Sequence, residues 1–363
     1  LDPDALAKAF DVLLETKRKA RQGSPSNTQK THVSSANNIQ ARTWLFEMLE
    51  NQVSLAGRDF SGLDLSGICF SGIDLRDVML EGCNLNYCDF SECNMSGAVL
   101  TEAQVSNASF IHADLSNTNF SLSRGENTLF HYATLDNSQF IQADYKDAEF
   151  NHIEADHIIA TEANFIACFF EYSVINNALM SNTDFTASRL DEANITASIF
   201  LQSVLTKTHW KAAMLDRCML IDVSAHEINF YRATLEKVQF SNVGDLEKAD
   251  FSYAHCNVCG FRGVNVSQSC FSYAALIECD FGDTQFNNAQ LNDAIFKRCV
   301  MTKASLTESI CQDALFNESL VRKVNFKKSN LTHAEFYNCT LEGNHLEHAA
   351  MRHLSIAPQP EMK

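Results

Sequence analysis

The sequence lacks several features that commonly reveal what a protein does. Its 363 residues contain no run of about 18 apolar residues, the length that a membrane-spanning helix needs, so no membrane span is expected. The basic stretch 17–21 has no apolar segment after it and is not a secretory signal. A P-loop, a G-x-G-x-x-G fingerprint, a zinc signature and a Ser-His-Asp spacing are also missing. These absences predict a protein that is not an enzyme and has no cofactor or metal.

Basic charge is scarce and unevenly placed. The chain has 28 Lys and Arg against 45 Asp and Glu, a formal net charge of −17. Residues 51–245 carry 10 basic and 26 acidic side chains, whereas residues 246–363 carry 11 and 13. Because nucleic-acid phosphates would be repelled, no nucleic-acid partner is expected. An acidic segment beside a nearly neutral one predicts two surfaces with different partners.

What the sequence does contain is a five-residue period. Large apolar residues recur at every fifth position from Leu55 to Phe240 and again from Leu246 to Ile356, and 23 of the 26 Phe lie in this register. A small residue stands two positions before most of them, often followed by Asp or Asn. A period of five fits neither an α-helix nor a plain strand. It predicts a short strand and a corner, repeated, with one large and one small side chain pointing inward.

Five stretches show the repeat most clearly: SGIDL (71–75), EGCNL (81–85), IHADL (111–115), DEANI (191–195) and EKADF (247–251). They resemble the pentapeptide-repeat family, whose motif is A(D/N)Lxx. The resemblance extends over residues 53–357. It implies an all-β solenoid, a right-handed quadrilateral β-helix in which four pentapeptides make one coil.

The register is interrupted in a few places. It slips by one residue within 241–246, which indicates a β-bulge or corner loop, or else a kink that sets a binding face. Gly125, Ala155, Ala160 and Ala225 occupy positions where a large residue is expected. These positions predict bulged or distorted coils.

The ends of the chain differ from the repeat. Residues 1–52 are expected to be helical, and a second helix with Trp44, Leu45, Met48 and Leu49 is expected to cover the open edge of the first coil. The chain begins with Leu1 rather than Met, which predicts a piece of a longer protein or a processed product. The expected order is a helix at about 3–21 with Asp2 as its N-cap, a linker at 22–37, a helix at about 38–51, the repeat at 53–357 and a tail at 358–363.

The cysteines follow the repeat, which predicts free thiols in a reducing compartment, each acting as a buried apolar side chain. Cys256 and Cys311 take the large inward position. Nine of the 13 take the small one: Cys83, Cys88, Cys93, Cys168, Cys218, Cys259, Cys279, Cys299 and Cys339. The C-terminal histidines His345, His348 and His353 match no zinc spacing, and surface histidines are favoured over metal ligands.

Two outward features are candidates for protein binding. Tyr253 and Tyr273 are 20 residues apart, so they should stack on one face as an interface, although incidental surface tyrosines are the alternative. Lys303 and Lys323 should also stack, beside Arg322, Lys327 and Lys328. This basic patch could receive an acidic partner, or it could be ordinary solvated surface.

Function is expected to be protein binding, in one of three settings. Residues 57–85, preceded by 2–6, look like the C-terminal repeat region of type VI secretion accessory proteins. That resemblance implies a bacterial, cytoplasmic adaptor that helps to load effectors onto the secretion spike. The first alternative is a DNA mimic that binds a type II topoisomerase, which the acidic stretch 51–245 favours. The second is a host-directed effector, secreted by a specialised system, in which the repeat is a targeting module.

Overall fold

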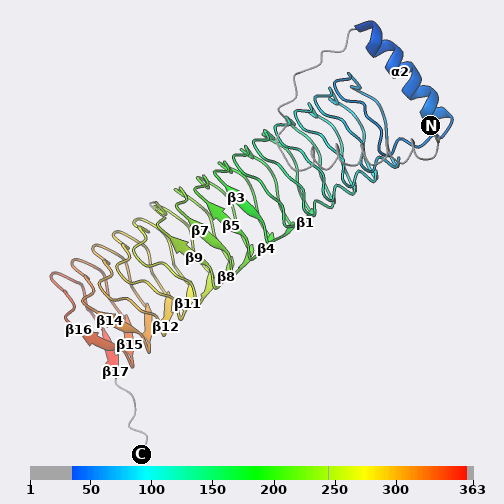
Figure 1. The fold of residues 1–363 in the computed structure, drawn as a ribbon. Coiled ribbons are helices and arrows are strands. Elements are labelled where there is room, and N and C mark those ends of the chain that lie inside the picture. The colour runs from blue at the N-terminus through cyan, green and yellow to red at the C-terminus, as the bar shows by residue number, and fades with distance from the viewer. Residues whose placement is uncertain (1–34, 244, 358–363) are drawn as a thin grey trace, which may run out of the picture. The chain divides into compact units, whose positions relative to one another are not determined.

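The computed structural model describes residues 35–243 and 245–357 (Figure 1). The chain divides into two compact units. Unit 1 is Leu1–Cys168 and unit 2 is Phe169–Lys363. Each is a right-handed, four-sided β-helix, as the repeat predicts. The expected helix at about 3–21, residues 22–34 of the expected linker and the tail at 358–363 lie outside the described residues.

Backbone pairing in unit 1 sets the size of the coil. Parallel bridges join residues 20 apart, and one bridge occurs on each of four sides: Asp59↔Met79, Asp64↔Asn84, Cys69↔Asp89 and Asp74↔Asn94. Four pentapeptides therefore complete one coil. The pairing is confined to isolated bridges until β1 (Glu154–Asp156).

The interior is filled by columns of stacked side chains from successive coils. Phe70, Phe90 and Phe110 stack with ring centroids 5.0 Å apart, close to the spacing between neighbouring strands. The small inward position holds Ser and Thr as well as Ala and Cys, which the sequence reading did not anticipate. The buried Thr118 hydroxyl donates to the carbonyl oxygen of Met95 at 3.1 Å, and the Cys83 thiol donates to that of Phe60 at 3.0 Å. These two groups are tolerated inside because each donates to a carbonyl 23 residues earlier in the chain, whereas others, such as Ser123, donate to a carbonyl three residues earlier.

Every corner uses the left-handed backbone conformation. The second residue after each large inward one has a positive φ, as at Gly57 (69°), Asn107 (57°) and Val258 (56°). Glycine and asparagine adopt this conformation readily, whereas a β-branched residue is strained there. Many residue types nevertheless occupy these corners, so the corners restrict the sequence less than the interior does. A β-branched residue at a corner carries a cost in backbone strain.

The strands of unit 2 are three residues long and lie on successive coils. Most of them bury the central residue and turn the other two outward, whereas the central residues of the last two strands, Leu341 and Ile356, are exposed. One side is built from β2 (Val174–Asn176), β4 (Asn194–Thr196), β6 (Met214–Asp216), β8 (Thr234–Glu236), β10 (His255–Asn257), β11 (Ala275–Ile277), β12 (Ile295–Lys297), β13 (Leu315–Asn317), β15 (Glu335–Tyr337) and β17 (Ser355–Ala357). The next side is built from β3 (Leu179–Ser181), β5 (Ile199–Leu201), β7 (Met219–Ile221) and β9 (Gln239–Ser241), and further along from β14 (Leu320–Arg322) and β16 (Thr340–Glu342).

The register slip is visible in the pairing of unit 2. Ile221 pairs with Ser241, 20 residues later, but Ser224 pairs with Asp245, 21 residues later. The two neighbouring sides also pair at 21 across this coil, Asn229 with Asp250 and Thr234 with His255. All four sides resume the interval of 20 afterwards, so one extra residue is accommodated within a single coil.

Helix α2 (Ser35–Glu50) covers the first coil of unit 1. The Asn38 side chain makes the hydrogen bonds that a neighbouring strand would make with Asp64. Its oxygen accepts the Asp64 N–H at 2.8 Å and its amide donates to the Asp64 carbonyl at 3.2 Å. Arg42 donates to the carbonyls of Asp64 and Ser66 at 3.0 and 3.2 Å. The helix begins at Ser35, within the expected linker, rather than at about 38. Among the described residues, no helix combines the length and apolarity that spanning a membrane requires.

The apolar side chains of α2 are only partly buried. Leu45 and Met48 are buried, whereas Trp44 is half-exposed, with its ring 6.5 Å from that of Phe60. The inward side chains of the first coil are covered, and Leu55 is fully buried. The polar and apolar contacts of α2 together protect the open edge of the coil.

Gly125 does not distort its coil, contrary to the sequence-based expectation. The bridge Arg124↔Asp144 keeps the interval of 20. The space of the missing side chain is taken by the ring of Tyr145, which a Cβ on Gly125 would overlap. Tyr145 is fully buried, and its hydroxyl is hydrogen-bonded to Ser123 at 2.8 Å. The large Tyr145 side chain thus fills the space left by Gly125 in the preceding coil.

Candidate functional site

The two tyrosines expected to stack do lie ring against ring on a corner of unit 2. The centroids of Tyr253 and Tyr273 are 4.8 Å apart with an interplanar angle of 11°, and each side chain is about half exposed. Tyr231 extends the row with an edge contact to Tyr253 at 5.7 Å. The Arg232 guanidinium lies 5.2 and 5.8 Å from the rings of Tyr231 and Tyr253. Asp293 raises the pKa of Tyr273 by its negative charge.

The basic residues further along unit 2 are largely paired with carboxylates. Arg322 contacts Glu342 at 2.7 Å, Lys327 contacts Glu347 at 3.2 Å, and Lys328 contacts Glu308 at 2.8 Å. Each carboxylate lies 20 residues from its partner, so the repeat itself places the two in neighbouring coils. Lys303 and Lys323 occupy the same column, one coil apart. This surface alternates in charge and is a weaker attractant for an acidic partner than the sequence suggests.

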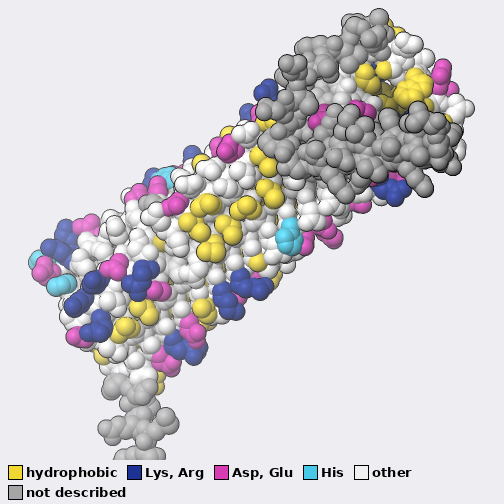
Figure 2. Space-filling model, viewed as in Figure 1, with side chains coloured by type: hydrophobic (Ala, Val, Ile, Leu, Met, Phe, Trp, Pro, Cys, Tyr) yellow, Lys and Arg dark blue, Asp and Glu magenta, His cyan; other side chains and the backbone are white. Residues whose placement is uncertain are grey.

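An apolar outward surface on β3, β5 and β7 was not identified from the sequence. It consists of Leu179, Ile199, Leu201, Met219 and Ile221, which we call the apolar face. Leu179 pairs with Ile199 and Ile199 with Met219, so the side chains stand in register on three neighbouring strands. Leu179 and Met219 are each 38% exposed. Figure 2 shows apolar side chains gathered over these strands.

The cysteines of the interior do not provide nucleophiles. All 13 are free, and ten of them are buried. Burial raises the pKa of Cys83 and Cys311 to about 12, and that of Cys88 and Cys93 to about 11. Their thiolates are therefore scarce at neutral pH. The three C-terminal histidines, His345, His348 and His353, are exposed.

A second cluster missed in the sequence lies beside the register slip. One ligand atom each from His226, Asp245 and Glu247 lies within 4.8 Å of the others. The three residues meet because Glu247 follows His226 by 21 positions rather than 20. Comparing residues 21 positions apart across the slip, instead of 20, would have predicted from the sequence that Glu247 lies beside His226.

Comparison with known families agrees with the coil geometry. The model of the pentapeptide repeat region matches residues 53–130 and 269–346. Both matched segments are pentapeptide-repeat regions. The two matched segments lie in units 1 and 2, and the same interval of 20 residues occurs in the coils between them. No curated protein matches the chain.

Several solved structures show distant similarity to the chain, and one of them, HetL, is described as a pentapeptide-repeat protein. A trypsin-treated variant of QnrB1, described as a plasmid-mediated fluoroquinolone resistance protein, is 17% identical over 46% of this chain and 82% of its own, with a TM-score of 0.35. HetL from the cyanobacterium Nostoc, described as involved in heterocyst differentiation regulation, is 16% identical over 85% and 94%, with a TM-score of 0.15. The Dettilon tailspike protein is 9% identical over 93% and 68%, with a TM-score of 0.33.

Proposed function

We propose that this protein is a non-enzymatic scaffold that binds another protein through the apolar face of unit 2. The observation that carries the proposal is the row of outward apolar side chains on β3, β5 and β7. On β9, the next strand of the same side, the outward residues are the polar Gln239 and Ser241. The apolar character is therefore not required by the coil.

The shape of the apolar face suits a protein partner. Leu179, Ile199 and Met219 stand at successive strand spacings, so the row is about 10 Å long before the flanking Leu201 and Ile221 are added. Such grouped apolar side chains on a soluble surface usually mark an interaction site. Burying them on association would supply the apolar centre that protein interfaces have.

Tyr253 and Tyr273 are proposed as additional contacts, together with Lys303, Arg322, Lys323, Lys327 and Lys328. Tyr253 precedes β10 and Tyr273 precedes β11, so both lie at the edge of the side that adjoins the one bearing the apolar face. Stacked, exposed tyrosines provide rigid contact area at low entropic cost. A partner that crosses this side could contact both features.

The proposed setting is a bacterial type VI secretion apparatus, in which the partner is an effector or a spike protein. This finer assignment rests on the resemblance of residues 57–85 alone. Recovery of spike or effector proteins in the cross-linking experiment described below would support this setting. Recovery of an unrelated protein at the apolar face would overturn the setting but retain the scaffold.

The acidic surface of unit 1 favours one alternative, a DNA mimic for a type II topoisomerase. Residues 53–168 carry 17 Asp and Glu against four Lys and Arg. Such a surface could occupy a DNA-binding channel. Inhibition of supercoiling by the purified chain, abolished when unit 1 carboxylates are neutralised, would favour this function over the scaffold.

The experiment places a photo-cross-linking amino acid at Ile199 in the full chain and exposes it to a lysate of the source cells. The matched control carries the same group at Gln104, an exposed outward position of unit 1. We expect a protein adduct from Ile199 that is absent from Gln104 and is suppressed by Leu179→Asp. Adducts only from Gln104, or equal adducts from both, would contradict the proposal.

A further inference from the structure

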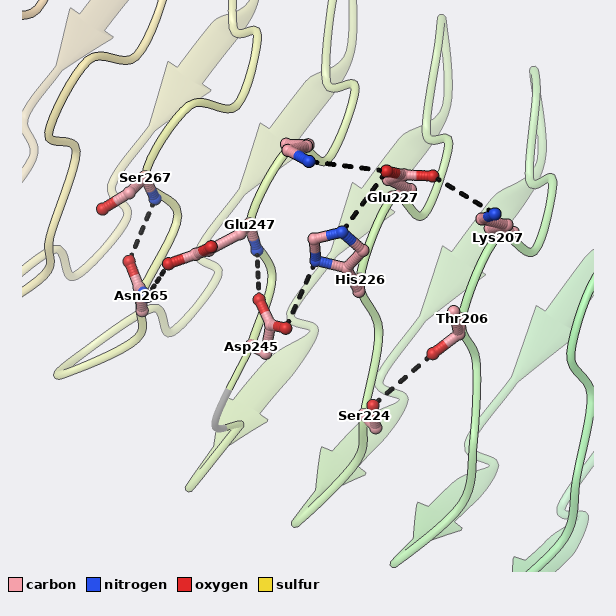
Figure 3. Close-up of polar contacts among 10 residues, drawn as sticks. Thr206, Lys207, Ser224, His226, Glu227, Asp245, Glu247, Asn265 and Ser267 are labelled. Carbon is pink, nitrogen blue, oxygen red and sulfur yellow. Dashed lines mark hydrogen bonds and ion pairs between the residues drawn. The ribbon is translucent and has the colours of Figure 1, made fainter.

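A corner of unit 2 brings three metal-ligating side chains together from two neighbouring coils (Figure 3). His226 Nδ1 lies 3.3 Å from Asp245 Oδ2. Ligand atoms about 2.0–2.2 Å from a tetrahedral zinc ion are about 3.3–3.6 Å from one another. The His226–Asp245 separation already matches one edge of such a polyhedron. A carboxylate oxygen of Glu247 lies within 4.8 Å of both of these ligand atoms.

In each carboxylate, one oxygen accepts a hydrogen bond and the other is available to a metal ion. Asp245 Oδ1 accepts the backbone N–H of Glu247 at 2.8 Å. Glu247 Oε1 accepts the Asn265 amide at 2.7 Å, and the Asn265 side-chain oxygen in turn accepts the Ser267 N–H at 3.1 Å. Metal ligands are typically oriented by such outer contacts.

The imidazole is oriented for the same purpose. His226 Nε2 lies 3.3 Å from Glu227 Oε1, so this carboxylate would accept the Nε2 proton when Nδ1 binds an ion. Nδ1 is buried and faces Asp245 Oδ2, without a well-aligned hydrogen bond among the described residues. Glu227 is itself flanked by Lys207 at 3.8 Å and Lys248 at 3.7 Å. It is better placed to orient the histidine than to bind a cation.

From this arrangement we propose that His226, Asp245 and Glu247 bind one divalent transition-metal ion of the zinc type. Two carboxylates balance the charge of the ion, and the imidazole nitrogen favours Zn²⁺ or Co²⁺ over Mg²⁺, which prefers oxygen ligands. The ion would tie together the two coils on either side of the register slip. The site does not depend on the scaffold function, because its residues are separate from the apolar face.

The test is a titration of the EDTA-treated, fully reduced 363-residue chain with Zn²⁺ by calorimetry and with Co²⁺ by visible absorption. We expect one equivalent whose binding is lost in His226→Ala and Asp245→Asn. Asn265→Leu, a positioning change, should weaken binding by about 10- to 100-fold. In the Co²⁺ spectrum, the d–d bands should disappear in His226→Ala.

Two controls separate this site from others in the chain. His131→Ala removes a histidine that contacts a single carboxylate, Glu149 at 2.7 Å, and should leave binding unchanged. Cys69→Ser removes an exposed thiol that could bind zinc independently. Absence of saturable Zn²⁺ binding, its survival in His226→Ala, or a preference for Mg²⁺ would overturn the proposal. Circular dichroism of each variant establishes that the coils remain folded.

Discussion

Between residues 53 and 168, unit 1 carries 17 acidic and four basic side chains, whereas unit 2 carries 21 and 16 between residues 169 and 357. Unit 1 pairs mainly through isolated bridges, and unit 2 has three-residue strands on two of its sides. Six corners of unit 1 in the described residues are glycines, but only two of unit 2 are, Gly263 and Gly343. The same period therefore supports two different surfaces.

The difference shows how a repeat separates stability from recognition. In both units the inward positions hold the same stacked phenylalanines, such as Phe90 with Phe110 at 5.0 Å and Phe251 with Phe271 at 4.6 Å. Because each coil is stabilised by its neighbours, outward residues can change without altering the coil. Unit 2 uses that freedom for the apolar face and the tyrosine row, whereas unit 1 uses it for negative charge.

The largest effect is expected from Tyr145→Ala in unit 1. It removes a fully buried ring that fills its own position and that of Gly125, so we expect a loss of about 3–5 kcal/mol. Tyr145→Phe keeps the ring and loses only the contact with Ser123, at a cost of about 1 kcal/mol.

Two tryptophans allow the units to be followed separately. Trp44 lies in unit 1 and Trp210 in unit 2, so denaturation is monitored with the other tryptophan replaced by Phe. Tyr145→Ala should shift the Trp44 transition to lower denaturant more than the Trp210 transition. Equal shifts would show that the two units unfold together.

A smaller effect is expected when the covering of the first coil is weakened. Asn38→Ala with Arg42→Ala removes the side chains that pair with the edge at Asp64, which should cost about 2 kcal/mol locally. Amide hydrogen exchange at Asp64 should accelerate, while exchange in unit 2 stays unchanged. Thr43→Ala, on the exposed side of α2, is the matched control. Unchanged exchange at Asp64 in the double variant would refute the covering role.

The smallest effect is expected at a strained corner of unit 2. Val258 has a φ of 56°, so Val258→Asn should stabilise the protein by about 1 kcal/mol. The reverse change, Asn288→Val at a φ of 58°, should destabilise it by a similar amount. Thermal denaturation of the two variants measures both. Shifts of the same sign would mean that backbone strain does not govern these corners.

The five-residue period was enough to predict the coil, because its inward positions allow few residues. It could not predict that Tyr145 compensates for Gly125, since that contact joins two positions that each break the pattern. The helix expected at about 38–51 begins at Ser35, because propensity does not fix where a helix starts.

The candidate surfaces were harder to predict for a different reason. Tyr253 and Tyr273 were found because both are tyrosine at an interval of 20. The apolar face went unnoticed because Leu179, Ile199 and Met219 differ in identity and stand beside inward residues that are also apolar. Glu247 meets His226 only at an interval of 21, which the slip imposes on one coil, and Asp245 is brought there by its pairing with Ser224 at the same interval.

The most direct test of the scaffold account is the affinity of the protein cross-linked at Ile199 for three forms of the chain. These are the unaltered chain, Leu179→Asp with Met219→Asp in unit 2, and Asp114→Asn with Glu102→Gln in unit 1. We predict that the unit 2 variant binds at least about 30-fold more weakly, as loss of two interface anchors implies, and that the unit 1 variant binds like the unaltered chain. Full affinity in the unit 2 variant together with weakened binding in the unit 1 variant would contradict the account.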